Sequence, residues 1–175
     1  MKKILTKWGF SKRGIFVNSK GEWYLFAQIL LIFLHLLPKY PKSDYILFPI
    51  NILLIIIGII ISFQGLIIVI IALIELGDNL TPLPYPMEDS ILIKTNSYNK
   101  SRHPIYKGLL LISMGIFIFT LSLIHLSLFV LLAYTLKTKA LIEEDRLKIK
   151  FPEYENYIKD VPAIMKNIIY LDWRS

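Results

Sequence analysis

The chain has 175 residues, of which 55% are hydrophobic, and its mean hydropathy of +0.56 is well above that of ordinary soluble proteins. It contains no cysteine, which excludes disulfides, thiolate nucleophiles and cysteine-ligated metals. The formal net charge is +7, but the lysines and arginines gather at the ends of apolar runs, as topology determinants of membrane proteins do. We therefore predict a single integral-membrane domain spanning residues 1–175, with the lipid bilayer as a partner, no nucleic acid and no bound metal.

Two apolar runs occupy the N-terminal part of the chain. Residues 23–37 rise only about 22 Å as a helix, so this run needs flanking residues to span a bilayer. Residues 46–76 would make a helix of about 46 Å, which is long for one span and short for two. Small or polar residues interrupt this second run at Gly58, Ser62, Gln64 and Gly65. We predict one tilted or kinked helix, and two half-spanning helices are the alternative.

Residues 77–104 form a long connection that is rich in proline. Each proline pushes the residue before it out of the helical region of backbone space. A connection of 28 residues without clear elements is either disordered or functional. Disordered segments usually lack apolar and aromatic side chains, and this one keeps Leu80, Leu83, Tyr85, Met87, Ile91, Leu92, Ile93 and Tyr98. We therefore predict an ordered, functional loop.

A helical hairpin is predicted next. A third apolar run covers residues 104–121, and a fourth extends from residue 125 to about 141. Residues 122–124 leave room only for a tight turn, so the two helices should pack antiparallel. The fourth helix then continues into the charged, amphipathic segment LIEEDRLKIKF.

The distribution of basic residues predicts the topology. Residues 1–22 carry six Lys or Arg, residues 38–45 two, residues 77–107 four and residues 137–175 eight. An even number of spans places the first, third and fourth of these groups on one side. The fold class is therefore expected to be all-α, a polytopic membrane bundle of about four transmembrane helices with both termini in the cytosol.

A group of polar residues stands where the third helix begins. Pro104 suits the first turn of a helix, and Ser101, Arg102 and His103 come directly before it. The free N–H groups of a helix start, the guanidinium and the imidazole would together favour an anion. Gly108, one turn inside, would let a ligand or another backbone approach closely. The alternative is that Arg102 binds lipid phosphate and Pro104 only starts a helix.

An acidic cluster follows at the cytosolic end of the fourth helix, where Glu143 and Glu144 precede Asp145 and Arg146. Because the third and fourth helices form a hairpin, this cluster should lie near the basic pair before Pro104. An acidic pair and a basic pair on opposite sides of the cytosolic opening of the helical bundle could hold a zwitterionic ligand. Ordinary surface salt bridges at i,i+4 spacing, such as Glu144 with Lys148, are the alternative.

Residues 151–162, FPEYENYIKDVP, by themselves predict an interfacial amphipathic helix. Taken in order, however, these pieces resemble the isoprenylcysteine carboxyl methyltransferase family of integral-membrane enzymes, which is related to phospholipid methyltransferases. The resemblance covers roughly residues 77–162, about half of the chain. It rests on GDNLTPLPYP at 77–86, on Ser101, Arg102, His103, Pro104, Ile105, Tyr106, Lys107 and Gly108, and on Glu143, Glu144, Leu147, Phe151, Tyr154, Tyr157, Val161 and Pro162.

This resemblance implies S-adenosylmethionine as the methyl donor, in a cytosolic cofactor pocket between the hairpin and the C-terminal segment. It also implies a lipophilic methyl acceptor that enters from the bilayer. Residues 1–76 would then supply the N-terminal transmembrane helices, residues 77–162 the methyltransferase motif region and residues 163–175 a tail. The activity implied is a transfer most like protein-S-isoprenylcysteine carboxyl O-methylation.

Carried over residue by residue, the resemblance assigns catalytic roles to Arg102 and Glu144. The residues that it assigns to cofactor binding are Tyr98, His103, Pro104, Tyr106, Gly108 and Glu143. The chain departs from the family pattern at Pro152, where a glycine is usual, and at residues 163–165, where basic and aromatic residues are usual. These departures leave the expected cofactor unchanged and bear on which methyl acceptor the protein would use.

Three other functions are compatible with the same residues. The chain could be a phospholipid or small-thiol methyltransferase of the same superfamily, a non-catalytic membrane interaction protein, or a reductase-like relative with a nicotinamide cofactor. A carboxylate acceptor is already ionised at neutral pH and needs no base, so Arg102 would orient it. An amine or phenol acceptor would need a base, for which Glu143, Glu144 and His103 are the candidates.

Overall fold

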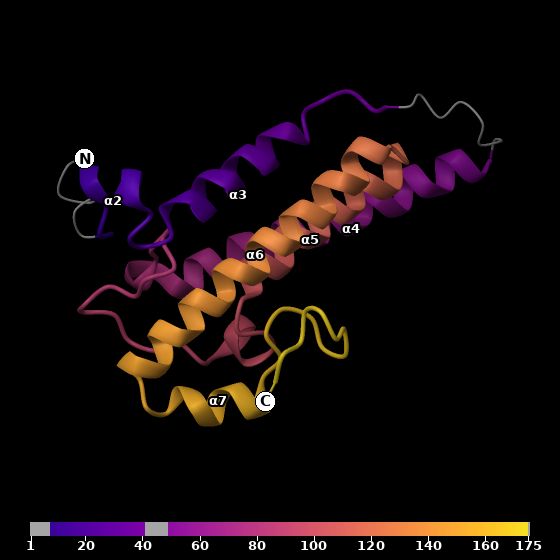
Figure 1. The fold of residues 1–175 in the computed structure, drawn as a ribbon. Coiled ribbons are helices and arrows are strands. Elements are labelled where there is room, and N and C mark those ends of the chain that lie inside the picture. The colour runs from indigo at the N-terminus through magenta and orange to yellow at the C-terminus, as the bar shows by residue number, and fades with distance from the viewer. Residues whose placement is uncertain (1–7, 41–48, 175) are drawn as a thin grey trace.

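The computed structural model describes residues 8–40 and 49–174, and every regular element in these ranges is helical (Figure 1). The helices in chain order are α2 (Lys12–Val17), α3 (Glu22–Leu34), α4 (Ile50–Leu76), α5 (Pro104–Thr120), α6 (Leu123–Lys150) and α7 (Tyr154–Asp160). Short 3₁₀ turns stand at Gly77–Asn79 and Asn96–Asn99. The all-α class predicted from the sequence is confirmed for these ranges.

Two of the described helices are long and apolar enough to cross a membrane. These are α4 with the turn that follows it, Ile50–Asn79, and α6. Helices α3 and α5 are also apolar but have only 13 and 17 residues. Most of the isoleucine and leucine side chains of α4 are exposed, which is the kind of apolar surface that lipid covers. The number of four spans stays a prediction.

The second apolar run is one helix over the residues described, as predicted, while its first residues, 46–48, lie outside the described ranges. Gly58 and Gly65, which interrupt the run, lie where α4 packs against α5. A Cβ atom on Gly65 would come within 2.6 Å of the Gly108 carbonyl oxygen, and one on Gly58 within 2.6 Å of the Gly115 carbonyl oxygen. These glycines therefore let the two backbones touch, as small residues do between membrane helices.

Helices α5 and α6 form the predicted hairpin, but its turn is shorter than expected. Leu121 adopts a left-handed conformation with φ of 48° and ends α5, and Ser122 directly precedes α6. Leu123 and Ile124, predicted to be part of the turn, already belong to α6. A left-handed leucine costs free energy, so this turn is held by the packing of the two helices around it.

The amphipathic segment after α6 does not present its apolar face to lipid. Tyr154, Tyr157 and Ile158 of α7 are buried. They pack against a group of partly buried apolar side chains from the 77–103 loop and the end of α6, namely Leu92, Leu147 and Phe151. The long loop is thus part of the folded domain, in agreement with the prediction that it is ordered.

The C-terminal residues are packed rather than a free tail. After α7 the chain turns back toward α6 (Figure 1). Ala163 and Ile164 are fully buried, and Leu171 is 6% exposed. Ile164 and Leu171 belong to the same core cluster as the α6 residue Leu136. Residues 161–174 therefore cover one side of the α5–α6 hairpin.

We predict that Gly65→Val lowers the free energy of unfolding by about 1–3 kcal/mol, because the new side chain meets the α5 backbone and forces the helices apart. Thermal unfolding of detergent-purified protein would measure the change. Ile59→Leu, on the exposed side of α4, is the matched control and should be close to neutral. Equal melting temperatures for Gly65→Val and the wild type would contradict the close packing of α4 on α5.

Candidate functional site

The SRHP segment, residues 101–104, is held in place by the C-terminal part of the chain. Its first three residues are each at most 5% exposed. The backbone N–H groups of Arg102 and His103 donate to the carbonyl oxygens of Pro162 and Ala163, both at 2.9 Å. The start of α5 and the residues after α7 thus form one unit, although they are far apart in the sequence.

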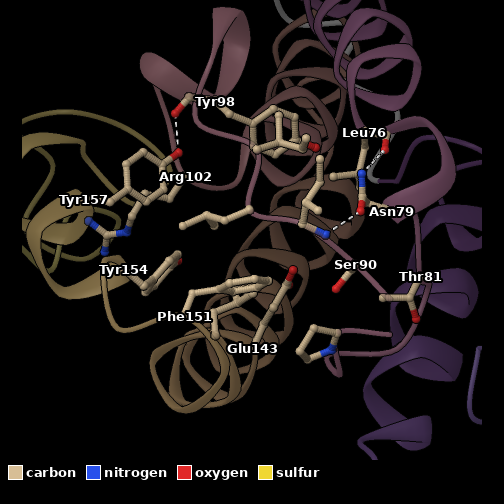
Figure 2. A pocket seen from close by; sticks show the side chains of 15 residues that line it. Leu76, Asn79, Thr81, Ser90, Tyr98, Arg102, Glu143, Phe151, Tyr154 and Tyr157 are labelled. Atoms are coloured by element: carbon tan, nitrogen blue, oxygen red, sulfur yellow. Dashed lines mark hydrogen bonds between the residues drawn. The ribbon is translucent and has the colours of Figure 1, made fainter. Parts of the chain in front are cut away.

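Arg102 is engaged on nearly all its donors. Its Nε and Nη2 atoms donate to the two carboxylate oxygens of Glu144, at 2.7 and 3.2 Å. Its Nη1 atom donates to the carbonyl oxygens of Ile158, at 3.0 Å, and Val161. This is a bidentate ion pair with a second contact to the end of α7. Figure 2 shows the guanidinium directed toward the C-terminal segment.

Glu144 is the centre of this network. Besides Arg102 it accepts hydrogen bonds from His103 Nε2, at 2.9 Å, and from Trp173 Nε1, at 2.8 Å. Each carboxylate oxygen therefore receives two donors, which fills the usual acceptor capacity of the group. The side chain is 3% exposed. The anion predicted beside Arg102 and His103 is thus supplied by the protein itself.

Glu143 differs from its neighbour in both contacts and exposure. It accepts one hydrogen bond, from the Tyr106 hydroxyl at 2.9 Å, and its side chain is 29% exposed. The Tyr106 ring stacks on the His103 ring, with centroids 5.2 Å apart and planes within 3°. His103 Nδ1 lies 3.8 Å from Glu143, beyond hydrogen-bond distance. Glu143 therefore keeps acceptor positions for a ligand.

A cavity of about 310 Å³ lies between α3, α4, α5 and α6, and we call it the α3–α4 cavity. Its size falls in the range of ligand sites. Its wall combines apolar side chains, such as Leu25 and Leu73, with polar side chains from the SRHP segment, α3 and α6. The polar and aromatic side chains in its lining include Gln28, Tyr98, Arg102, His103, Tyr106, Lys139 and Glu143.

A smaller cavity of about 70 Å³, the loop cavity, lies between the 77–93 loop, the end of α6 and α7 (Figure 2). Tyr98, Arg102 and Glu143 line both cavities, so the two meet at these side chains. Figure 2 shows the Glu143 side chain among the residues that line the loop cavity. Glu143 can therefore contact a group in either cavity.

Three tyrosines surround the loop cavity. Burial raises the pKa values of Tyr98, Tyr154 and Tyr157, and nearby carboxylates raise those of Tyr98 and Tyr154 further, so all three phenols stay protonated. The Tyr157 hydroxyl donates to the Tyr98 carbonyl oxygen. The Tyr154 hydroxyl is buried without a hydrogen-bond partner in the described part of the chain. It is therefore a donor available to a ligand.

The structure brings most of the predicted site residues together. Five of those predicted to bind the cofactor line the α3–α4 cavity, namely Tyr98, His103, Pro104, Tyr106 and Glu143. Gly108 lies elsewhere, packed against Gly65 of α4, so its close neighbour is a backbone rather than a ligand. Arg102 and Glu144, predicted to be catalytic, are paired with each other.

Three residues at the site were missed from the sequence. Lys139 and Gln28 line the α3–α4 cavity, and Trp173 bonds Glu144. Lys139 stands four residues before Glu143, and this spacing on one helix face could have identified it. No local signal pointed to Gln28 or Trp173, which reach the site only through the fold. Within residues 8–40 and 49–174, no group of three His, Asp or Glu side chains is placed to hold a metal ion.

We predict that Glu144→Gln lowers the free energy of unfolding by about 3–5 kcal/mol, since it leaves the buried Arg102 charge without an anion. Glu143→Gln is the matched control and should cost about 1 kcal/mol or less, because it loses only part of one hydrogen bond at a half-buried position. Denaturant or thermal unfolding in detergent would compare the two. Similar losses in both variants would contradict the distinct roles of these carboxylates.

Comparison with known proteins shows the family of the chain. A family model described as phospholipid methyltransferase matches residues 53–153, which run from α4 through the SRHP segment and the two glutamates to the end of α6. No curated protein matches the chain significantly. The match covers more than half of the chain and confirms the resemblance to membrane methyltransferases drawn from its motifs. The chain belongs to the phospholipid methyltransferase family, whose members are membrane methyltransferases.

Proposed function

We propose that the protein transfers a methyl group from S-adenosylmethionine to a lipophilic acceptor at the membrane. Family membership supports methyl transfer, and proteins of this family generally use this cofactor. The observation that carries the proposal is the α3–α4 cavity, in which charged and polar side chains, among them His103, Lys139 and Glu143, share one space with apolar side chains of α3 and α4. Such a space suits a charged cofactor beside a lipid.

The donor set fits this cofactor. Its amino-acid end carries a carboxylate and an ammonium group, and the cavity holds both a lysine and a glutamate, Lys139 and Glu143. Its adenosine end needs aromatic faces and hydrogen-bond donors. Phe151, Tyr157 and the unpartnered hydroxyl of Tyr154 line the adjoining loop cavity, whose volume of about 70 Å³ takes only part of an adenosine. When bound, S-adenosylmethionine supplies a methyl group already activated on a sulfonium centre.

The residues of the chain itself then have to position the reacting groups and exclude water from them. Arg102 and Glu144 fix His103 and the end of α7, so their part in catalysis would be to hold the cavity wall rigid. Tyr106 holds Glu143 through its hydroxyl. Glu143 lies where the two cavities meet and would face the group that receives the methyl.

The chemistry required of the site depends on the class of methyl acceptor. The motifs resemble those of enzymes that methylate a prenylcysteine carboxylate, and the family match is equally consistent with a phospholipid acceptor, such as its amine. A carboxylate needs no base at neutral pH, and orientation would suffice. An amine that is protonated in water must lose its proton first, and Glu143 is the side chain with acceptor capacity at the site.

We also propose the four-span topology with both termini in the cytosol. The start of α5, the end of α6, α7 and the C-terminal segment gather at one end of the bundle (Figure 1). The α5–α6 turn lies at the other end, where the Tyr40 backbone bonds the Ser122 hydroxyl. Positive charge concentrates at the first of these ends, which supports its cytosolic location.

Single cysteines test this topology directly, because the natural chain has none. We predict that Glu153→Cys, at the α7 end, reacts with a membrane-impermeant maleimide only after the cells are opened. Tyr40→Cys, at the opposite end, should react in intact cells. Both positions are exposed, so accessibility to the reagent is set by the side of the membrane. Labelling of both in intact cells would overturn the proposed orientation.

Calorimetry with S-adenosylhomocysteine, the demethylated cofactor, tests the proposed function. We predict micromolar binding to the detergent-purified wild type and a loss of about tenfold or more in His103→Ala, which removes a ring from the cavity wall. Lys148→Ala, exposed on α6 outside the cavities, is the control and should bind as the wild type does. A folded wild type that binds nothing would favour a non-catalytic membrane protein.

A screen for methyl transfer follows if the cofactor binds. Radiolabelled S-adenosylmethionine would be offered with lipophilic carboxylates, phospholipid amines and thiols in separate reactions. The product identifies the acceptor class. Transfer to none of these by a protein that binds the cofactor would contradict the proposed transfer to a lipophilic acceptor.

A further inference from the structure

One polar side chain of α4 is not explained by the packing of this helix on α5. Of the four residues that interrupt the apolar run, Gly58 and Gly65 let the α5 backbone approach closely. Ser62 donates to the carbonyl oxygen of Ile112 in α5, at 3.3 Å. Gln64 is exposed instead, and within residues 8–40 and 49–174 its side chain has no hydrogen-bond partner. The donor and the acceptor of this amide are therefore left for another partner.

The depth of Gln64 in the membrane makes such a partner necessary. α4 is one of the two described helices that are long and apolar enough to cross a bilayer. Gln64 lies about 21 Å from Ile50 and about 18 Å from Leu76 along the helix axis, so it is near the middle of the span. Its side chain is too short to reach the headgroups from there. Hydrocarbon offers no hydrogen bonds, so an amide exposed at this depth points to a protein partner.

Gln64 also stands in the middle of a regular row of exposed side chains, which we call the α4 seam. Its members follow one another at alternating spacings of four and three residues, the repeat by which one helix packs along another. At about 100° per residue, the centre of the seam lies roughly 150° around α4 from the residues that face α5. The α4 seam consists of Leu53, Ile57, Ile60, Gln64, Ile67, Ile71 and Ile74, all of them exposed.

We propose that the α4 seam is an interface through which two copies of this chain pair in the membrane, with Gln64 of each copy bonded to the partner's Gln64. Two copies inserted in the same orientation are related by a twofold axis along the bilayer normal. A residue near this axis meets its own counterpart at the same depth.

The chemistry of the glutamine favours a second copy over other occupants. Its amide donates through the nitrogen and accepts through the oxygen, so two facing glutamines satisfy each other with two reciprocal hydrogen bonds. A lysine or a glutamate at this position would be repelled by its counterpart. A single polar residue in an otherwise apolar seam also fixes the register of the two helices, because a shift along the axis would leave both amides unpaired.

The pairing goes beyond the proposed function and involves a different surface. No member of the α4 seam lines the α3–α4 cavity or the loop cavity. Substitutions in the seam are therefore expected to leave the binding of S-adenosylhomocysteine as it is in the wild type. This separation allows the pairing and the methyl-transfer function to be tested independently.

Fluorescence energy transfer in lipid vesicles measures the pairing. The full-length chain would carry donor or acceptor dyes on Glu153→Cys, an exposed position, and the amount of lipid would be increased stepwise. We predict energy transfer that falls on dilution. Gln64→Leu should weaken the pairing by about three- to twentyfold, the range for hydrogen bonds between membrane helices. Gln64→Asn keeps the amide and should restore most of the affinity.

Disulfide cross-linking locates the interface, because the natural chain has no cysteine and Gln64 can be kept. A disulfide forms only where the two Cα atoms come within about 7 Å. Under copper-catalysed oxidation in membranes, Ile60→Cys and Ile67→Cys should yield covalent dimers. Ile70→Cys is the matched control, because it is exposed to a similar degree as Ile67, 47% against 41%, but lies outside the seam. It should remain largely monomeric.

Each contrary result has a definite meaning. A wild type without energy transfer at any lipid ratio would overturn the pairing and leave Gln64 to a different membrane protein. Energy transfer that is unchanged in Gln64→Leu, or equal cross-linking of Ile67→Cys and Ile70→Cys, would overturn the α4 seam as the interface. A chain that pairs but does not bind S-adenosylhomocysteine would instead refute the proposed function alone.

Discussion

Arg102 and Glu144 form a bidentate ion pair that is almost wholly buried, and four distant parts of the chain are attached to it. Removing both charges from water costs several kcal/mol for each ion, and only a complete set of hydrogen bonds offsets such a cost. That set comes from the SRHP segment, α6, the carbonyl oxygens at the end of α7 and the indole of Trp173. The site is therefore assembled only when all four are in place.

This constraint explains why two adjacent glutamates take different parts. Glu144 points into the network and has no acceptor position left, whereas Glu143 points toward the cavities and has a single hydroxyl partner. Neighbours on a helix are rotated by about 100° from each other, so a pair of identical residues can serve two environments. The Glu144 carboxylate holds the wall of the site in place, and the Glu143 carboxylate is free to contact a ligand.

Some of the fold follows from local patterns in the chain. The length of the apolar runs and the prolines that bound them were enough to place α4, α5 and α6 to within a few residues, because burial in lipid demands long, uninterrupted helices. The predicted α5–α6 turn is longer than the turn in the structure, because a leucine in the left-handed region is not expected from sequence. The role of Gly108 was also ambiguous, because a glycine admits a ligand and a backbone equally well.

The sequence by itself determined the membrane class, the helical hairpin and the residue types that gather at one mouth, since these depend on hydropathy, proline and charge within short windows. Only the tertiary structure decided which charges are satisfied. Lys139 meets Gln28 across 111 positions and Trp173 meets Glu144 across 29. Such pairings depend on how separate helices pack, and no periodicity along the chain encodes them.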